Sequence, residues 1–73
     1  MNEYLVVYEN AGPNWSAYVP DLPGCIGTGD SLEDCKEDIQ QAIATYVEAA
    51  RDLGRAVPPP STKGEYVAVA RSA

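Results

Sequence analysis

Short apolar runs, bounded by polar, glycine or proline residues, occur three times in the N-terminal part of the chain and again near its C-terminal end. Residues 3–9 (EYLVVYE) and 15–19 (WSAYV) are β-branched and aromatic runs joined by a turn-forming segment, which predicts an antiparallel hairpin. Residues 25–29 (CIGTG) predict a short third strand, weakened by its glycines. Residues 65–70 (EYVAVA) predict a fourth strand.

Between the third and fourth predicted strands, the apolar residues recur with the period of a helix. Ser31 is a suitable N-cap with Asp34 at the third helical position, and Gly54 stands where a C-cap glycine is expected. Apolar residues at steps of three and four trace one face of this helix: Leu32, Cys35, Ile39, Ala42, Ile43, Tyr46, Val47, Ala50 and Leu53. The next segment, 57–61 (VPPPS), predicts a stiff extended connection. The order βββαβ predicts an α+β fold, one domain over residues 1–73, with the helix on one face of a sheet.

A single helix covers only one face of a sheet, while the first predicted strand carries apolar side chains on both faces. Tyr4, Val6 and Tyr8 share one face, and Leu5 and Val7 share the other. The other reading is that edge strands tolerate some exposed apolar residues. We favour an interface on the uncovered face, formed by self-association or with a protein partner.

The charge and composition of the chain narrow the classes of function. The net charge is −6, from 11 acidic and 5 basic residues, and the bases are scattered, so we expect no direct binding of nucleic acid. Acidity favours a basic partner, although it also serves solubility. The absence of histidine removes the commonest general base. Without a bilayer-spanning run or a signal peptide we expect a cytoplasmic protein with no membrane contact, and Cys25 and Cys35 as reduced thiols rather than a disulfide.

Two further patterns have a structural and a functional interpretation. The glycines at 27–29 (GTG) precede a helix, as in a phosphate-binding loop, but the loop has no lysine and Asp30 adds negative charge, so a tight connection explains them better. Acidic residues gather at the start of the helix, where they complement its dipole but also repel each other at a spacing of four; they are Glu33, Asp34, Glu37 and Asp38. This balance leaves room for a basic partner. We expect no cofactor, no metal and no catalytic residue.

The bend between the second and third strands, 18–25 (YVPDLPGC), contains two prolines that interrupt sheet pairing, and one glycine, Gly24, that permits unusual backbone angles or a close approach. Together with 28–30 (TGD), the helix start 31–33 (SLE) and 58–61 (PPPS), it resembles the HicB antitoxin family along essentially the whole chain. The resemblance implies a partial ribonuclease-H-like βββαβ fold, with a four-stranded mixed sheet in the order 3-2-1-4 and one long helix packed on one face.

The resemblance also implies a function. Members of this family are antitoxins of type II toxin–antitoxin systems that bind a small basic HicA toxin, an mRNA interferase, and block its active site. The alternative is a stand-alone domain of the same family that assembles with itself into a dimer or tetramer and neutralises no toxin. Typical members carry a C-terminal DNA-binding domain, and because this chain ends just after its fourth predicted strand, operator binding is not expected.

A ribonuclease-H-like fold raises the question of nuclease activity. That chemistry needs converging carboxylates, one of them central on the first strand, whereas the interior of 3–9 holds none. We therefore expect a protein that is not an enzyme. The residues expected to contact a partner are Trp15, Tyr18, Asp21, Pro23, Gly24 and Asp30. Trp15 and Tyr18 fit interface anchors and packed strand residues equally well.

Overall fold

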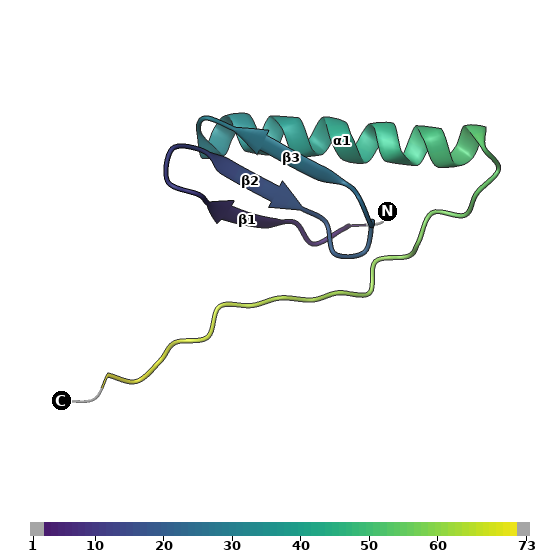
Figure 1. Cartoon of the computed structure of the whole chain (residues 1–73). Helices are drawn as coiled ribbons and strands as arrows, with labels where there is room; N and C mark the ends of the chain where they lie inside the picture. Colours follow the sequence, from purple (N-terminus) through teal and green to yellow (C-terminus); the bar gives the residue numbers. More distant parts are fainter. Residues whose placement is uncertain (1–2, 72–73) are drawn as a thin grey trace.

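The computed structural model describes residues 3–71 of the chain. This part contains the strands β1 (Val7–Asn10), β2 (Trp15–Tyr18) and β3 (Ile26–Gly29), followed by the helix α1 (Leu32–Asp52). The strands form an antiparallel sheet in the order β1-β2-β3, and α1 lies against one face of it (Figure 1). The predicted α+β class and the helix-on-sheet arrangement are confirmed.

The first strand starts later than its sequence pattern predicts. β1 pairs with β2 from Val7, which lies opposite Tyr18. Continuing that register would place Leu5 opposite Pro20, which has no N–H to donate and turns the chain away. Residues 3–6 therefore have no ladder partner on β2, although their side chains are suited to a strand.

The bend between β2 and β3 folds back into the core. The N–H of Leu22 donates to the carbonyl of Val19 at 3.0 Å, and the N–H of Cys25 donates to the carbonyl of Leu22 at 3.0 Å. All three side chains are buried, and Gly24 takes a positive φ of 83° between them. The apolar residues of the bend thus build the core, and its prolines and Gly24 form the outer surface.

Both predicted ends of the helix are confirmed. The side-chain oxygen of Ser31 accepts a hydrogen bond from the N–H of Asp34 at 3.1 Å. At the other end Gly54 has a φ of 67°, and the N–H of Arg55 donates to the carbonyl of Ala50 at 2.8 Å. These local bonds satisfy backbone groups that a helix leaves unpaired at its termini.

The helix packs closely on β3 because that strand has glycines on its inner face. A Cβ at Gly27 would lie 3.0 Å from the Cα of Ile39, and one at Gly29 would lie 2.8 Å from the carbonyl carbon of Asp34. The core between the two layers consists of Ala17, Val19, Leu22, Cys25, Cys35 and Ile39. The glycines that weaken β3 as a strand are thus what brings α1 into contact with the sheet.

The predicted fourth strand over residues 65–70, and with it the sheet order 3-2-1-4, is not formed in the structure, which corrects this part of the predicted topology. After the helix, the chain crosses back toward the sheet, where the Tyr4 hydroxyl donates a hydrogen bond to the carbonyl of Pro58. Beyond Gly64 it continues as an exposed, extended segment past the β1 side of the sheet, away from α1 (Figure 1). Strand propensity describes how side chains fit a sheet, and it does not by itself supply a paired edge.

Candidate partner-binding surfaces

Asp21, which is expected to contact a partner, binds the C-terminal part of its own chain in the structure. Its Oδ2 accepts hydrogen bonds from the backbone N–H groups of Ser61 and Thr62, both at 2.9 Å. Its Oδ1 accepts from the two hydroxyls, at 3.0 Å from Ser61 and 2.7 Å from Thr62. We call this arrangement the Asp21 clamp. The backbone N–H of Thr62 and then that of Ser61 are the main causes that lower the pKa of Asp21 from 3.8 to about 2.

Tyr18 lies on the face of the sheet that the helix leaves uncovered. The strand register places it between Val7 on β1 and Ile26 on β3, so three apolar side chains form a row across the sheet. Tyr18 is 43% exposed and Ile26 is 67% exposed. We call Val7, Tyr18 and Ile26 the outer row. The prediction that one helix leaves an apolar sheet face uncovered is confirmed in residues 3–71.

The remaining candidate residues do not gather around Tyr18. Trp15 is half-buried and packs against the core, on the face of β2 that α1 covers. Asp30 is exposed beside the helix N-cap, at the same end of the sheet as Trp15. Pro23 and Gly24 are exposed in the bend at the opposite end. The six candidates are therefore divided between two ends and both faces of the sheet, and they do not form one continuous site.

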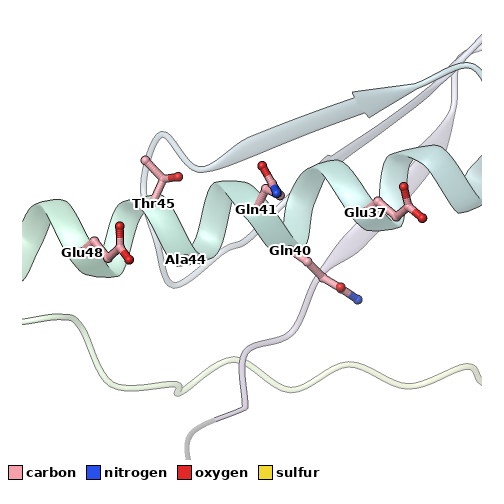
Figure 2. A pocket seen from close by; sticks show the side chains of 6 residues that line it. All are labelled: Glu37, Gln40, Gln41, Ala44, Thr45 and Glu48. Atoms are coloured by element: carbon pink, nitrogen blue, oxygen red, sulfur yellow. The ribbon is translucent and has the colours of Figure 1, made fainter.

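The helix carries a surface that the candidate residues did not include. A shallow depression of about 480 Å³ follows its solvent side, and it is lined by Glu37, Gln40, Gln41, Ala44, Thr45 and Glu48 (Figure 2). A second depression of about 310 Å³, lined by Thr28, Asp34, Glu37, Asp38 and Gln41, extends it toward β3. We call Asp34, Glu37, Asp38, Gln41, Thr45 and Glu48 the acidic side of α1. Their recurrence at steps of three and four opposite the apolar face is the signal that could have found this surface.

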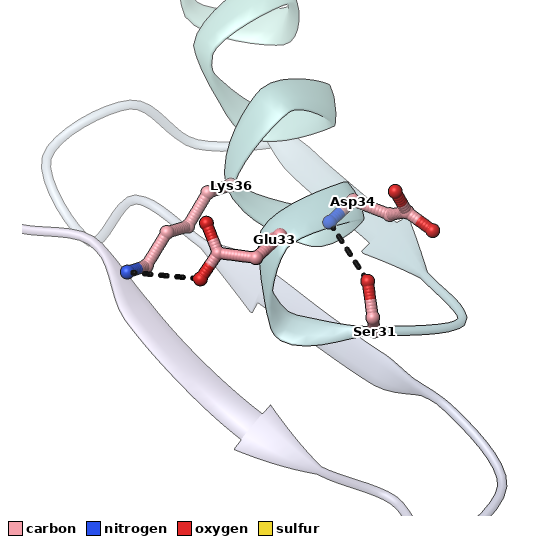
Figure 3. A network of polar contacts seen from close by, with 4 residues as sticks. All are labelled: Ser31, Glu33, Asp34 and Lys36. Atoms are coloured by element: carbon pink, nitrogen blue, oxygen red, sulfur yellow. Dashed lines mark hydrogen bonds and ion pairs between the residues drawn. The ribbon is translucent and has the colours of Figure 1, made fainter.

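Some of the acidic residues at the start of α1 serve the fold. Asp38 accepts a hydrogen bond from the N–H of Thr28 on β3 at 2.8 Å, which ties the helix to the outer strand. Glu33 lies 3.9 Å from the ammonium of Lys36, a pair exposed to solvent and therefore of little energetic weight (Figure 3). Glu37 and Glu48 are exposed and line the depression. These two carboxylates are accordingly the acidic groups best placed to meet a basic partner.

Metal-ligand clusters, thiols and membrane-spanning helices can be examined directly in the described residues. Across residues 3–71, no three His, Cys, Asp or Glu side chains lie close enough together to hold a metal ion. Cys25 and Cys35 are free and buried, and burial raises the pKa of both thiols, so neither is an activated nucleophile at neutral pH. No helix in this part of the chain has the length and apolar content to cross a membrane.

Comparisons with known proteins agree with this picture. The family described as "HicB_like antitoxin of bacterial toxin-antitoxin system" matches residues 4–71. Antitoxin HicB 2 of Photorhabdus laumondii subsp. laumondii is 34% identical over 62 residues, which are 85% of this chain and 45% of that protein. An uncharacterized 14.9 kDa protein of Haemophilus phage HP1 is 25% identical over 64 residues, which are 88% of this chain and 48% of the phage protein.

The fold is also similar to that of a solved structure. A chain of a HicA3 and HicB3 toxin-antitoxin complex superposes with a TM-score of 0.69 and 27% identity, covering 81% of this chain and 70% of that one. The chain spans about half the length of the curated relatives that it matches. The family match begins at residue 4, just before β1, and continues to residue 71. It includes the Asp21 clamp, the outer row and the acidic side of α1. This chain belongs to the HicB-like antitoxin family of bacterial toxin-antitoxin systems.

Proposed function

We propose that this protein is an antitoxin that binds a HicA-like toxin and neutralises it, acting in the cytoplasm through a single antitoxin domain over residues 1–73. The observation that carries the proposal is the family match over residues 4–71, together with the similarity to a chain of a HicA3 and HicB3 toxin-antitoxin complex. The described residues add an acidic surface along α1. In this proposal inhibition is steric and electrostatic, because the antitoxin covers the toxin's active site.

The acidic side of α1 is the surface that we assign to the toxin. It presents Glu37 and Glu48 along a depression, and the chain as a whole carries a net charge of −6. A small toxin that acts on RNA needs a basic surface for phosphate, and an acidic partner on that surface excludes the RNA. Tyr18, Pro23, Gly24 and Asp30 are exposed and remain candidates for contacts at the edge of this interface.

The test uses the full chain and its proposed partner, a HicA-like toxin. The two are co-expressed, purified together and assayed for RNA cleavage, and the double variant Glu37→Lys, Glu48→Lys is compared with Glu3→Lys, Glu9→Lys. Both pairs change the net charge equally, and all four residues are exposed. We expect the first pair to weaken toxin binding about 10-fold or more, because attraction becomes repulsion at two exposed positions. Equal effects of the two pairs would remove the assignment of this surface, and absence of binding by the unchanged chain would refute the antitoxin function.

A second candidate function is that of a self-assembling domain without a toxin. Two observations favour self-association as such: Tyr18 and Ile26 of the outer row are exposed, and the C-terminal segment is unpaired in the described structure. Light scattering without toxin separates the candidates, since only the second requires a dimer or tetramer. Self-assembly with no effect on a HicA-like toxin would favour this function over neutralisation.

A further inference from the structure

The edge of β1 is open in the described structure. β1 pairs with β2 on one side, and the sheet order β1-β2-β3 leaves its other side without a strand. A groove of about 340 Å³ follows that edge, lined by Leu5, Val6, Val7 and Tyr8 on one side and by Gly64, Glu65 and Tyr66 on the other. An open edge with apolar side chains is a template for one more strand.

The segment after Gly64 has the properties of the missing strand. Residues 65–71 are extended and exposed, and within the described structure their backbone makes no hydrogen bond to the sheet. The exposed fractions of Tyr66, Val67 and Val69 lie between 72% and 106%, which is unusual for large apolar residues so close together. In a strand, Tyr66 and Ala68 would lie on one face and Val67 and Val69 on the other, so both faces would be apolar.

The position of the segment directs it outward. The Asp21 clamp holds residues 61–62, and a Cβ at Gly64 would lie 3.2 Å from the Leu5 side chain, so the chain touches the start of the β1 edge. It then leaves the body, which gives the molecule dimensions of 57 × 28 × 19 Å (Figure 1). The radius of gyration is 14.8 Å, compared with about 11 Å for a compact domain of this length.

The length and charge of the segment fit the same edge on another molecule. Seven extended residues reach about 23 Å, while the four-residue strand β1 is about 13 Å long, so the segment can pair along all of it. Residues 65–71 hold one acidic residue, Glu65, and one basic residue, Arg71, so the segment has no net charge, while the chain as a whole carries −6. A neutral segment can therefore approach a second acidic body without the repulsion expected between two negative surfaces.

We propose that residues 65–70 of one copy add as a fourth strand to the β1 edge of a second copy, and that the exchange is reciprocal. Each molecule then donates one strand and accepts one, so both open edges and both exposed segments are covered at once. The exchange supplies between two molecules the strand next to β1 that is missing within one. It does not depend on toxin binding, and it goes beyond the proposed antitoxin function.

The test measures mass and contacts in the full chain without toxin. Light scattering over a range of concentrations gives the dimer dissociation constant. Isotope-filtered NMR on a mixture of labelled and unlabelled protein then detects contacts between residues 65–70 of one molecule and residues 5–8 of the other. We expect a dimer with these intermolecular contacts. A monomer, or a segment whose contacts with residues 5–8 are all within one molecule, would overturn the proposal.

Proline substitutions test whether the dimer depends on backbone pairing. Neighbouring residues of a strand direct their N–H groups to opposite edges, so Val67→Pro and Ala68→Pro remove donors on the two sides of the segment. We expect at least one of them to raise the dimer dissociation constant about 10-fold or more. Both chains of the dimer carry the substitution, so one hydrogen bond is lost at each of the two exchanged strands. Lys63→Pro, which lies before the segment, is the matched control and should dimerise as the unchanged chain does. A dimer that both Val67→Pro and Ala68→Pro leave intact would refute strand exchange. Because toxin is absent throughout, neither result bears on toxin neutralisation.

Discussion

The close approach of α1 to β3 can be tested by giving the inner glycines of β3 a side chain. In Gly27→Ala the new Cβ would lie 3.0 Å from the Cα and the backbone nitrogen of Ile39, whereas carbon atoms pack at about 3.5–4.0 Å. The helix or the strand must therefore shift by roughly 0.5 Å. Overpacking of this kind costs about 1–3 kcal/mol, and the smaller entropy of an unfolded alanine chain offsets about 0.4–1 kcal/mol. We expect a net loss of about 1–2 kcal/mol in the free energy of unfolding.

A graded series makes this prediction specific. Gly29→Ala should lower the free energy of unfolding more than Gly27→Ala does. Its Cβ would come closer to the helix backbone, overlapping the backbone nitrogen of Cys35 and lying 2.8 Å from the carbonyl carbon of Asp34. Thr28→Ala, on the exposed face of the same strand, should change the free energy of unfolding by about 0.5 kcal/mol at most. Thermal unfolding followed by circular dichroism at one protein concentration is the assay, and each kcal/mol corresponds to about 4–8 °C in a domain of this size. If both glycine variants unfold at the temperature of Thr28→Ala, α1 does not pack on β3 as described.

Two more predictions concern the Asp21 clamp and the thiols. Asp21→Asn should free the segment after Pro60, seen as faster proteolysis and faster amide exchange at residues 61–64, while the core stays protected. In the unchanged chain the same contact should depend on pH, because folding lowers the pKa of Asp21 from 3.8 to about 2. The clamp therefore stabilises the folded protein above about pH 4, and this stabilisation is lost as the pH falls from there toward 2. Unchanged exchange in Asp21→Asn would contradict the clamp. Cys25 and Cys35 should react with a thiol reagent slowly in the native protein and fully in denaturant, since both are buried and burial raises the pKa of each thiol; rapid native labelling would contradict this packing.

Local features of the fold could be predicted from the sequence because their causes are close together in the chain. The Ser31 N-cap and the Gly54 C-cap each depend on residues within a few positions, and the structure confirms both. The family resemblance carried by the bend and its neighbouring motifs is likewise confirmed, by the match over residues 4–71. The face uncovered by the helix followed from alternation in one strand and the presence of one helix.

The features that could not be predicted depend on contacts between distant residues. The four hydrogen bonds that Asp21 accepts come from Ser61 and Thr62, about 40 positions away, and the bend around Asp21 gives no sign of them. Residues 65–70 have the composition of a strand, yet in the described structure they form no backbone hydrogen bond with the open β1 edge of their own molecule. The candidate residues were chosen one by one by type, and only the three-dimensional structure shows that they are divided between two ends of the sheet.

The central claim is that this chain neutralises a HicA-like toxin by covering its RNA-binding surface. The most direct measurement is RNA cleavage by the purified HicA-like toxin proposed as its partner, titrated with this protein at low and high salt. We predict that cleavage stops at a stoichiometric amount of the chain, and that more is needed at high salt because exposed charges attract less strongly there. A toxin that still cleaves RNA at the same rate in a large excess of this protein would contradict the account.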